Sequence, residues 1–156
     1  MQKQTMNESE VQEILCEYFQ KLGYSVSTNE RLSGGNRIDI VAKSAKEEWY
    51  IEVKGDYEKR VEQYGTNFDT GMGQLLKSIV CIGDRIKYAI GIPISTTERG
   101  ERLSYRLILP KYSKSVIFEI LNLHMLLVRD DGSVEIIKPA GVKNFFESVD
   151  SAIRNG

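Results

Sequence analysis

The chain has 156 residues, 41% hydrophobic and 28% charged, which predicts one folded domain over residues 1–156 with a substantial core. Its formal net charge of −1 excludes a positive potential over the whole surface that would attract nucleic acid. Local clusters of basic residues matter more for such binding than the net charge. The polar N-terminal stretch and the absence of a long apolar run predict a cytoplasmic protein with no membrane contact.

The first half of the chain predicts a helix followed by three strands. Hydrophobic residues at three- and four-residue spacings favour a helix over residues 8–22. Residues 24–36 are typical of a short strand that leads into a glycine-rich turn. Two segments rich in Ile, Val, Trp and Tyr, about 37–43 and 48–54, predict two further strands.

The second half alternates helices and strands. Residues 56–70 are charged and irregular, which predicts a loop or a partial helix. The remaining expected elements are a helix over about 71–82, a buried strand over 86–94, helices over 98–109 and 113–123, a hairpin over 124–139 turning at Asp131–Gly132, and a last helix over 142–154. Cys16 and Cys81 both lie in helical patterns and are expected to be buried, reduced thiols. The element order predicts the α/β class, a mixed sheet flanked by helices.

The pattern that carries chemistry is the hairpin "NRIDIVAKSAKEEWYIEVKG". If residues 44–47 form its loop, counting outward from the loop places Asp39 opposite Glu52 and Arg37 opposite Lys54. Side chains alternate across a strand, so all four are expected on one face.

Two carboxylates that face each other across a ladder, with Cβ atoms roughly 4.5–5.5 Å apart, repel unless a cation lies between them. Such an oxygen-rich site suits Mg²⁺ together with water and a phosphate, and Lys54 is placed to reach the same group. The alternative is a half-exposed hairpin whose charges pair across the ladder, Asp39 with Arg37 or Lys54.

These residues resemble the PD-(D/E)xK signature of the restriction-endonuclease-like superfamily, which includes archaeal Holliday-junction resolvases and Mrr-type restriction enzymes. Asp39 in "RIDIVA" matches the aspartate, and Glu52 and Lys54 in "YIEVKG" match the (D/E)xK element. The resemblance implies that Asp39, Glu52 and the backbone carbonyl of Val53 bind a divalent metal. It also implies that Lys54 assists the attacking water.

The order of elements around the motif also resembles this superfamily. Relatives often carry a glutamate on the first helix and a glutamine near the start of the helix after the lysine strand, which implies roles for Glu8 and Gln74. Two departures stand out: Ile38 replaces the proline before the aspartate, and Ser78 lies where some relatives have a tyrosine four residues after the glutamine. The second departure argues against the RecB-like branch.

DNA contacts are expected from residues near the motif. Asn36 and Arg37 follow the Gly34–Gly35 pair, from which they could hydrogen-bond phosphate, and Lys77 lies three residues after Gln74. An ordinary turn and an ordinary polar helix flank are the alternatives.

The sequence and the resemblance together predict a Mg²⁺-dependent DNA endonuclease, with Mn²⁺ able to substitute, that leaves a 5′-phosphate and a 3′-hydroxyl. Cutting both strands of a duplex needs two active sites, which favours a homodimer. The low net charge leaves room for a partner subunit that supplies DNA affinity. The alternatives are a catalytically inactive nuclease-fold DNA-binding or regulatory module, and an interaction scaffold whose hairpin charges are only surface.

Overall fold

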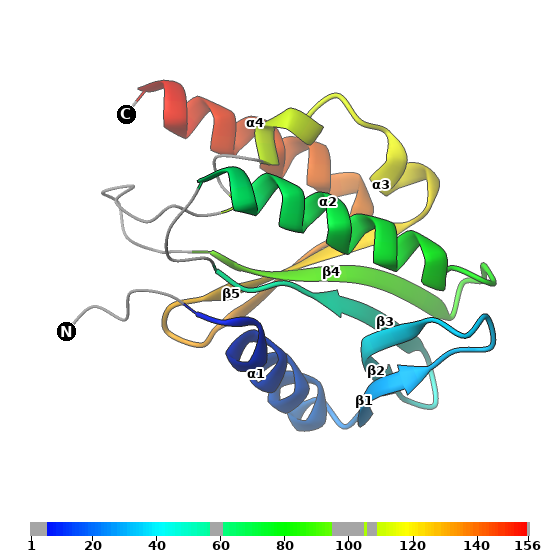
Figure 1. The fold of residues 1–156 in the computed structure, drawn as a ribbon. Helices are drawn as coiled ribbons and strands as arrows, with labels where there is room; N and C mark the ends of the chain where they lie inside the picture. Colours follow the sequence, from blue (N-terminus) through cyan, green and yellow to red (C-terminus); the bar gives the residue numbers. More distant parts are fainter. Residues whose placement is uncertain (1–5, 57–60, 95–104, 106–108, 156) are drawn as a thin grey trace.

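The chain forms a six-stranded sheet with helices on both faces, as a computed structural model shows for residues 6–56, 61–94, 105 and 109–155 (Figure 1). The elements are α1 (Glu8–Lys21), β1 (Ser25–Arg31), β2 (Arg37–Lys43), β3 (Glu48–Val53), α2 (Val61–Ser78), β4 (Ile86–Ile94), the 3-10 turn η2 (Leu109–Tyr112), α3 (Ile117–Ile120), β5 (Leu123–Arg129), β6 (Val134–Ile137) and α4 (Pro139–Asn155). The predicted α/β class is confirmed. Within the described ranges, no helix combines the length and apolarity needed to cross a bilayer.

The strands lie in the order β1-β2-β3-β4-β5-β6, and the sheet is mixed. β1, β2 and β3 are antiparallel neighbours, β3, β4 and β5 run parallel, and β6 is antiparallel to β5. β4 and β5 are buried along almost their whole length, as their continuous apolar sequences predict for strands covered on both faces.

Helices cover the two faces unequally. Among the described helices, α1 lies on one face, whereas α2, α3 and α4 lie on the other (Figure 1). Leu15 and Phe19 of α1 pack with Ile51 of β3 in one core, and Phe68 of α2 packs with Phe146 of α4 in the second core. The end of β3 therefore lies between α1 and α2.

Of the loop or partial helix expected over residues 56–70, the helix is found over residues 61–70, because α2 begins at Val61, while 57–60 lie outside the described residues. Glycines and β-branched or short polar residues lower the helix propensity of this stretch. Tertiary packing overrides that preference, since one face of the helix is buried through Tyr64, Phe68, Met72 and Leu75. Their spacing is the sequence signal that would have extended the expected helix over 71–82 back to Val61.

Other boundaries also differ from expectation. The hairpin over β5 and β6 is confirmed, with Gly132 at a φ of 81° in its turn. The helix expected over 113–123 is only the four-residue α3, and the helix expected over 98–109 lies outside the described residues except at 105 and 109. α2 ends at Ser78, so Cys81 lies beyond it and is exposed, while Cys16 is only half-buried.

Candidate active site

The register predicted for the β2–β3 hairpin is confirmed where the two strands pair. Lys43 lies opposite Glu48 and Ile40 opposite Ile51, and the ladder ends there. Beyond this point, the carboxylate of Asp39 takes the place of a backbone acceptor, because its Oδ2 accepts a hydrogen bond of 2.7 Å from the Val53 N–H. Asp39 is therefore held against the end of β3.

Arg37 does not pair with Lys54, because the β2–β3 ladder ends at Ile40 and Ile51. Ile38 packs into the core beneath α2 whereas Ile40 packs into the core beneath α1, although residues two apart in a regular strand share a face. β2 thus loses its alternation next to Asp39, although its register with β1 is the same on both sides of this residue. Arg37 is exposed, and its Nη1 donates a hydrogen bond of 2.9 Å to the Asn29 carbonyl.

Lys54 is the buried cation of the site. It is 7% exposed, and its Nζ lies 3.6 Å from Oε1 of Glu52, which is 4% exposed, and 4.0 Å from Oε2 of Glu8. Gly71 of α2 makes room for the aliphatic part of this side chain, because a Cβ there would lie 3.0 Å from both Cγ and Cε of Lys54. The glycine that weakens the helix thus admits the lysine.

Hydrogen bonds tie the start of α1 to the segment that follows β3. The Asp56 N–H donates to the Met6 carbonyl (2.8 Å), and the Met6 N–H donates to Oδ2 of Asp56 (3.1 Å). The hydroxyl of Tyr105 donates to the Gly55 carbonyl (2.7 Å). Gly55 packs so closely that a Cβ there would lie 2.2 Å from the Glu8 nitrogen, which explains the need for glycine.

A capping box fixes the first turn of α1. The Asn7 side chain accepts a hydrogen bond from the Glu10 N–H, and the Glu10 carboxylate accepts one from the Asn7 N–H, each 2.9 Å long. Glu8, the first residue of the helix, is thereby held beside Lys54.

The negative charge of Asp39 helps to raise the pKa of both Glu52 and Glu8. Burial is the largest cause that raises the pKa of Glu52, to about 8, followed by the charge of Asp39 and a hydrogen bond with it, while Lys54 acts in the opposite direction. Burial also raises the pKa of Glu8, which Lys54 lowers and Asp39 raises. One lysine therefore does not neutralise the three acids, and this cluster favours an additional proton or cation.

The carboxylate oxygens of the cluster fit a hard divalent cation that keeps several water ligands. Within the described part of the chain, no three His, Cys, Asp or Glu side chains are grouped as a ready-made metal cage. Mg²⁺ commonly uses only one or two carboxylates and completes its shell with water and substrate phosphate. Asp39 and Glu52, whose carboxyl groups interact at the end of β3, satisfy that requirement.

The raised pKa of Glu52 predicts that stability falls as pH rises from about 4.5 to about 8. Between the ordinary value of 4.5 and about 8, the folded chain retains a proton that the unfolded chain has lost. The free energy of unfolding then decreases as pH rises through this window, by up to about 1.4 kcal/mol per pH unit. Urea denaturation across that range is expected to show the slope in the wild type and to lose it in Glu52→Gln. The exposed Glu17→Gln should keep the slope, and equal slopes in all three proteins would contradict the assignment.

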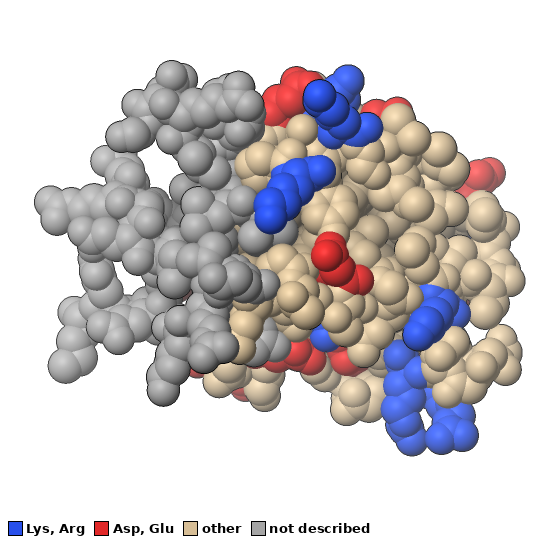
Figure 2. All heavy atoms as spheres, turned by 45° about the horizontal axis from the view of Figure 1, so that its top comes forward, with Lys and Arg blue, Asp and Glu red and all other residues tan. Residues whose placement is uncertain are grey.

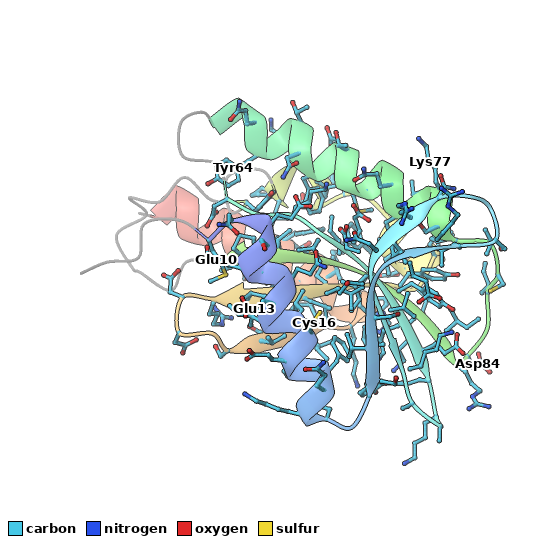
Figure 3. All side chains as sticks on the ribbon, turned by 60° about the horizontal axis from the view of Figure 1, so that its bottom comes forward. Glu10, Glu13, Cys16, Tyr64, Lys77 and Asp84 are labelled. Carbon is cyan, nitrogen blue, oxygen red and sulfur yellow. The ribbon has the colours of Figure 1, made fainter. Side chains whose placement is uncertain are left out.

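The remaining predicted residues do not join this cluster. Gln74 is exposed on α2, and none of the cluster's interactions found among the described residues involves its side chain. Asn36 donates through Nδ2 to the Lys77 carbonyl (3.1 Å), so these two lie together. Figure 3 shows Lys77 near one end of α2 and Tyr64 near the other, where Glu10 of α1 also lies.

Basic side chains are sparse on the face covered by α2 and α4. Figure 2 shows Lys and Arg spread singly among uncharged and acidic side chains, with a gathering only at one lower corner. Among the described residues on this face there is no continuous basic track of the kind that follows a DNA backbone.

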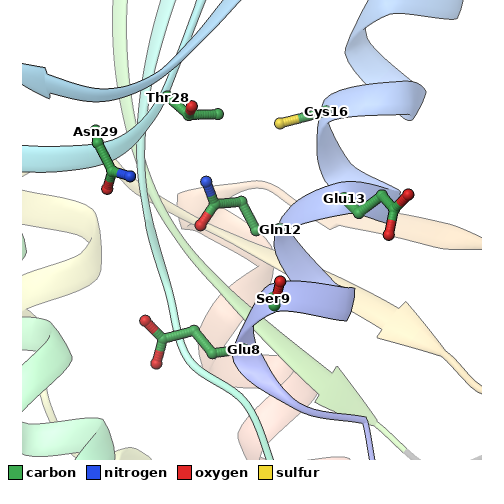
Figure 4. A pocket seen from close by; sticks show the side chains of 7 residues that line it. All are labelled: Glu8, Ser9, Gln12, Glu13, Cys16, Thr28 and Asn29. Carbon is green, nitrogen blue, oxygen red and sulfur yellow. The ribbon is translucent and has the colours of Figure 1, made fainter.

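Sequence reasoning missed a cleft beside the cluster. An open cleft of about 490 Å³ lies between α1 and β1, and its lining includes Glu8, Gln12 and Cys16 on the helix and Thr28 and Asn29 on the strand (Figure 4). The four-residue spacing of the three helical residues was a signal for one lining face. The opposing strand could not be predicted from it.

Comparisons with known proteins agree with the motif. A restriction endonuclease family model, Mrr_cat, matches residues 3–65, the segment that contains Glu8, Asp39, Glu52 and Lys54. The crystal structure of an XisH family protein from Nostoc punctiforme has a similar fold, with a TM-score of 0.54 and 18% identity over 81% of this chain and 98% of that chain. A search of curated proteins finds no significant match. The motif and the family match over residues 3–65 support a similarity to the restriction-endonuclease-like, PD-(D/E)xK superfamily, and the solved structure agrees with it in fold.

Proposed function

We propose that the protein is a metal-dependent DNA endonuclease that hydrolyses phosphodiester bonds at the cluster of Glu8, Asp39, Glu52 and Lys54. The observation that carries the proposal is the buried Lys54 ammonium, 3.6 Å from Glu52 and 4.0 Å from Glu8, in a chain whose nuclease family match spans these residues. A buried lysine beside an excess of acids is a costly arrangement for structure alone, and such groups concentrate at functional sites.

Asp39, Glu52 and the Val53 carbonyl are proposed to hold the divalent cation, Mg²⁺ or Mn²⁺. When bound, the cation neutralises charge on the phosphate and lowers the pKa of the attacking water. Lys54 donates hydrogen bonds to that water or to a phosphate oxygen and orients the in-line attack. Glu8 keeps the lysine charged and is positioned to accept a proton, since burial raises its pKa above the ordinary carboxyl value.

DNA contacts are proposed outside the carboxylate cluster, where β1 and β2 meet the C-terminal end of α2. Arg37 and its register partner Arg31 are both exposed, and Asn36 contacts the end of α2 that carries Lys77. These cations can neutralise phosphates without entering the carboxylate cluster. Gln74, exposed and outside the cluster's contacts, keeps only a proposed role at the edge of the site.

The test compares the wild type with Asp39→Asn on supercoiled plasmid and branched DNA, with Mg²⁺ or Mn²⁺. The amide oxygen preserves an acceptor for the Val53 N–H, so the fold is retained while one charge is lost. Metal-dependent cleavage is expected in the wild type and should fall by at least about 100-fold in the variant. The exposed Asp84→Asn is the control and should cleave normally.

Thermal melting without DNA separates the alternatives. Mg²⁺ is expected to raise the melting temperature of the wild type through binding to the folded state, and to raise that of Asp39→Asn much less. Metal binding without cleavage of any DNA favours the inactive nuclease-fold module. If neither binding nor cleavage occurs, the proposal is wrong and the hairpin charges serve structure only.

A further inference from the structure

We propose that the α1–β1 cleft accepts an unpaired nucleobase next to the scissile phosphate, held by Gln12 and Asn29. This inference rests on the proposed function and names its substrate class: DNA with an unstacked nucleotide beside the cut. The first support for this proposal is the location of the cleft beside the carboxylate cluster. Glu8 belongs both to that cluster and to the lining of the cleft. A nucleotide that enters the cleft is thus continuous with a phosphate at Lys54.

The lining suits a base and disfavours a phosphate. It contains Glu8 and Glu13 and neither lysine nor arginine, so a phosphate there would meet only like charge. The other lining side chains are uncharged. In Figure 4, Gln12 of α1 and Asn29 of β1 extend towards each other across the opening, while Glu13 points away. Amide side chains offer donors and acceptors together, which is what the edges of bases present.

The backbone of β1 is distorted where it supplies Asn29. Asn29 has a φ of 52°, a left-handed conformation that few residues other than glycine adopt, although asparagine tolerates it better than most. The pairs Thr28–Ile40 and Glu30–Ile38 flank this position, so Asn29 lies opposite Asp39. Its carbonyl is fixed by Arg37. The distortion thus occurs beside the proposed metal ligand, where strained residues commonly serve function.

The shape of the cleft requires the base to leave its stack. Bases within a duplex are reached by elements that protrude into a groove, such as a helix or a β-ribbon. A cleft set between a helix and a strand reaches a base edge only when that base is unpaired and turned outward. The volume of about 490 Å³ lies within the range of pockets that hold small organic ligands.

The test measures binding in the Lys54→Met background with Mg²⁺, where the DNA stays intact. A labelled duplex with a central single-nucleotide bulge is compared with a continuous duplex of equal length by fluorescence anisotropy. Asn29→Gly removes the amide and still allows the positive φ, and Gln12→Ala removes the opposing amide. Each is expected to weaken binding of bulged DNA roughly 5- to 100-fold and to leave duplex affinity unchanged. The exposed Gln20→Ala on the same helix should change neither.

Cys16 offers a readout independent of affinity. In a Cys81→Ser background it is the only cysteine, and it lines the cleft. Bulged DNA is expected to slow its alkylation at mildly alkaline pH, and continuous duplex is not.

The inference is overturned if both DNAs bind equally and neither protects Cys16, or if Asn29→Gly weakens both to the same extent. Metal-dependent plasmid cleavage with no preference for bulged DNA keeps the nuclease and rejects the base site. Selective binding of bulged DNA by a wild-type protein that cuts no DNA keeps the base site and rejects the nuclease.

Discussion

Replacing Lys54 with methionine is expected to reduce metal-dependent DNA cleavage by at least about 100-fold while leaving the chain folded. The ammonium lies 3.6 Å from Glu52 and 4.0 Å from Glu8, and no other lysine or arginine contacts these acids among the described residues. Methionine retains an unbranched side chain that can pack against Gly71, where Lys54 now lies. The measurement is the initial rate of plasmid nicking with saturating Mg²⁺.

Stability measurements on Lys54→Met test whether Lys54 stabilises the charged forms of Glu52 and Glu8. Without Lys54, the carboxylates of Glu52 and Glu8 lose the cation that lowers the pKa of each. The metal-free variant is therefore expected to lose stability more steeply than the wild type as pH rises. Lys143→Met, an exposed substitution on α4, is the control for both experiments. Full cleavage activity in Lys54→Met would exclude the lysine from the chemistry, whatever its effect on stability.

Replacing Gly55 with alanine is expected to destabilise the fold by about 1–3 kcal/mol or more and to reduce cleavage as well. The added Cβ would lie 2.2 Å from the Glu8 nitrogen and 2.6 Å from the carbonyl carbon of Asn7, so backbone has to move. The movement displaces the start of α1, which carries Glu8 to the site. Urea denaturation gives the loss of stability, and nicking rates on protein that is still folded give the loss of function.

Gly73→Ala is the matched control for that experiment. Gly73 lies in α2, and a Cβ there has nothing within 4 Å. Alanine in a helix interior should therefore raise stability by roughly 0.5–1 kcal/mol and leave cleavage unchanged. If Gly55→Ala behaves like Gly73→Ala, the contact between Gly55 and α1 is looser than the geometry indicates, and Glu8 does not depend on it.

Local sequence patterns predicted α1 and the β2–β3 hairpin well. The register of that hairpin follows from its four-residue loop, and the Ser44 N–H donates to the Glu47 carbonyl (2.9 Å) within it. The pairing of Asp39 with Glu52 in one cluster followed from the same counting. Short-range geometry decides such features, because neighbouring residues in the chain make the hydrogen bonds.

Local patterns failed where distant contacts compete with propensity. α2 contains Gly65 and Gly71, which argue against a helix, yet burial of Tyr64 and Phe68 outweighs them. Arg37 was expected beside the carboxylates because alternation was assumed to continue along β2. The break in alternation lies opposite the strained Asn29 of β1, and no pattern within the hairpin indicates it.

The sequence by itself determined which residues form the cluster at the end of β3, because the spacing of Asp39, Glu52 and Lys54 is set by a short hairpin. Only the tertiary structure decided how the cluster is completed. Glu8 reaches Lys54 because Gly55 lets α1 approach the end of β3, and the cleft exists because β1, the next element in the chain, folds back across from α1. Both depend on packing between elements, whose geometry is set by the contacts of the whole fold and not by the period of any one segment.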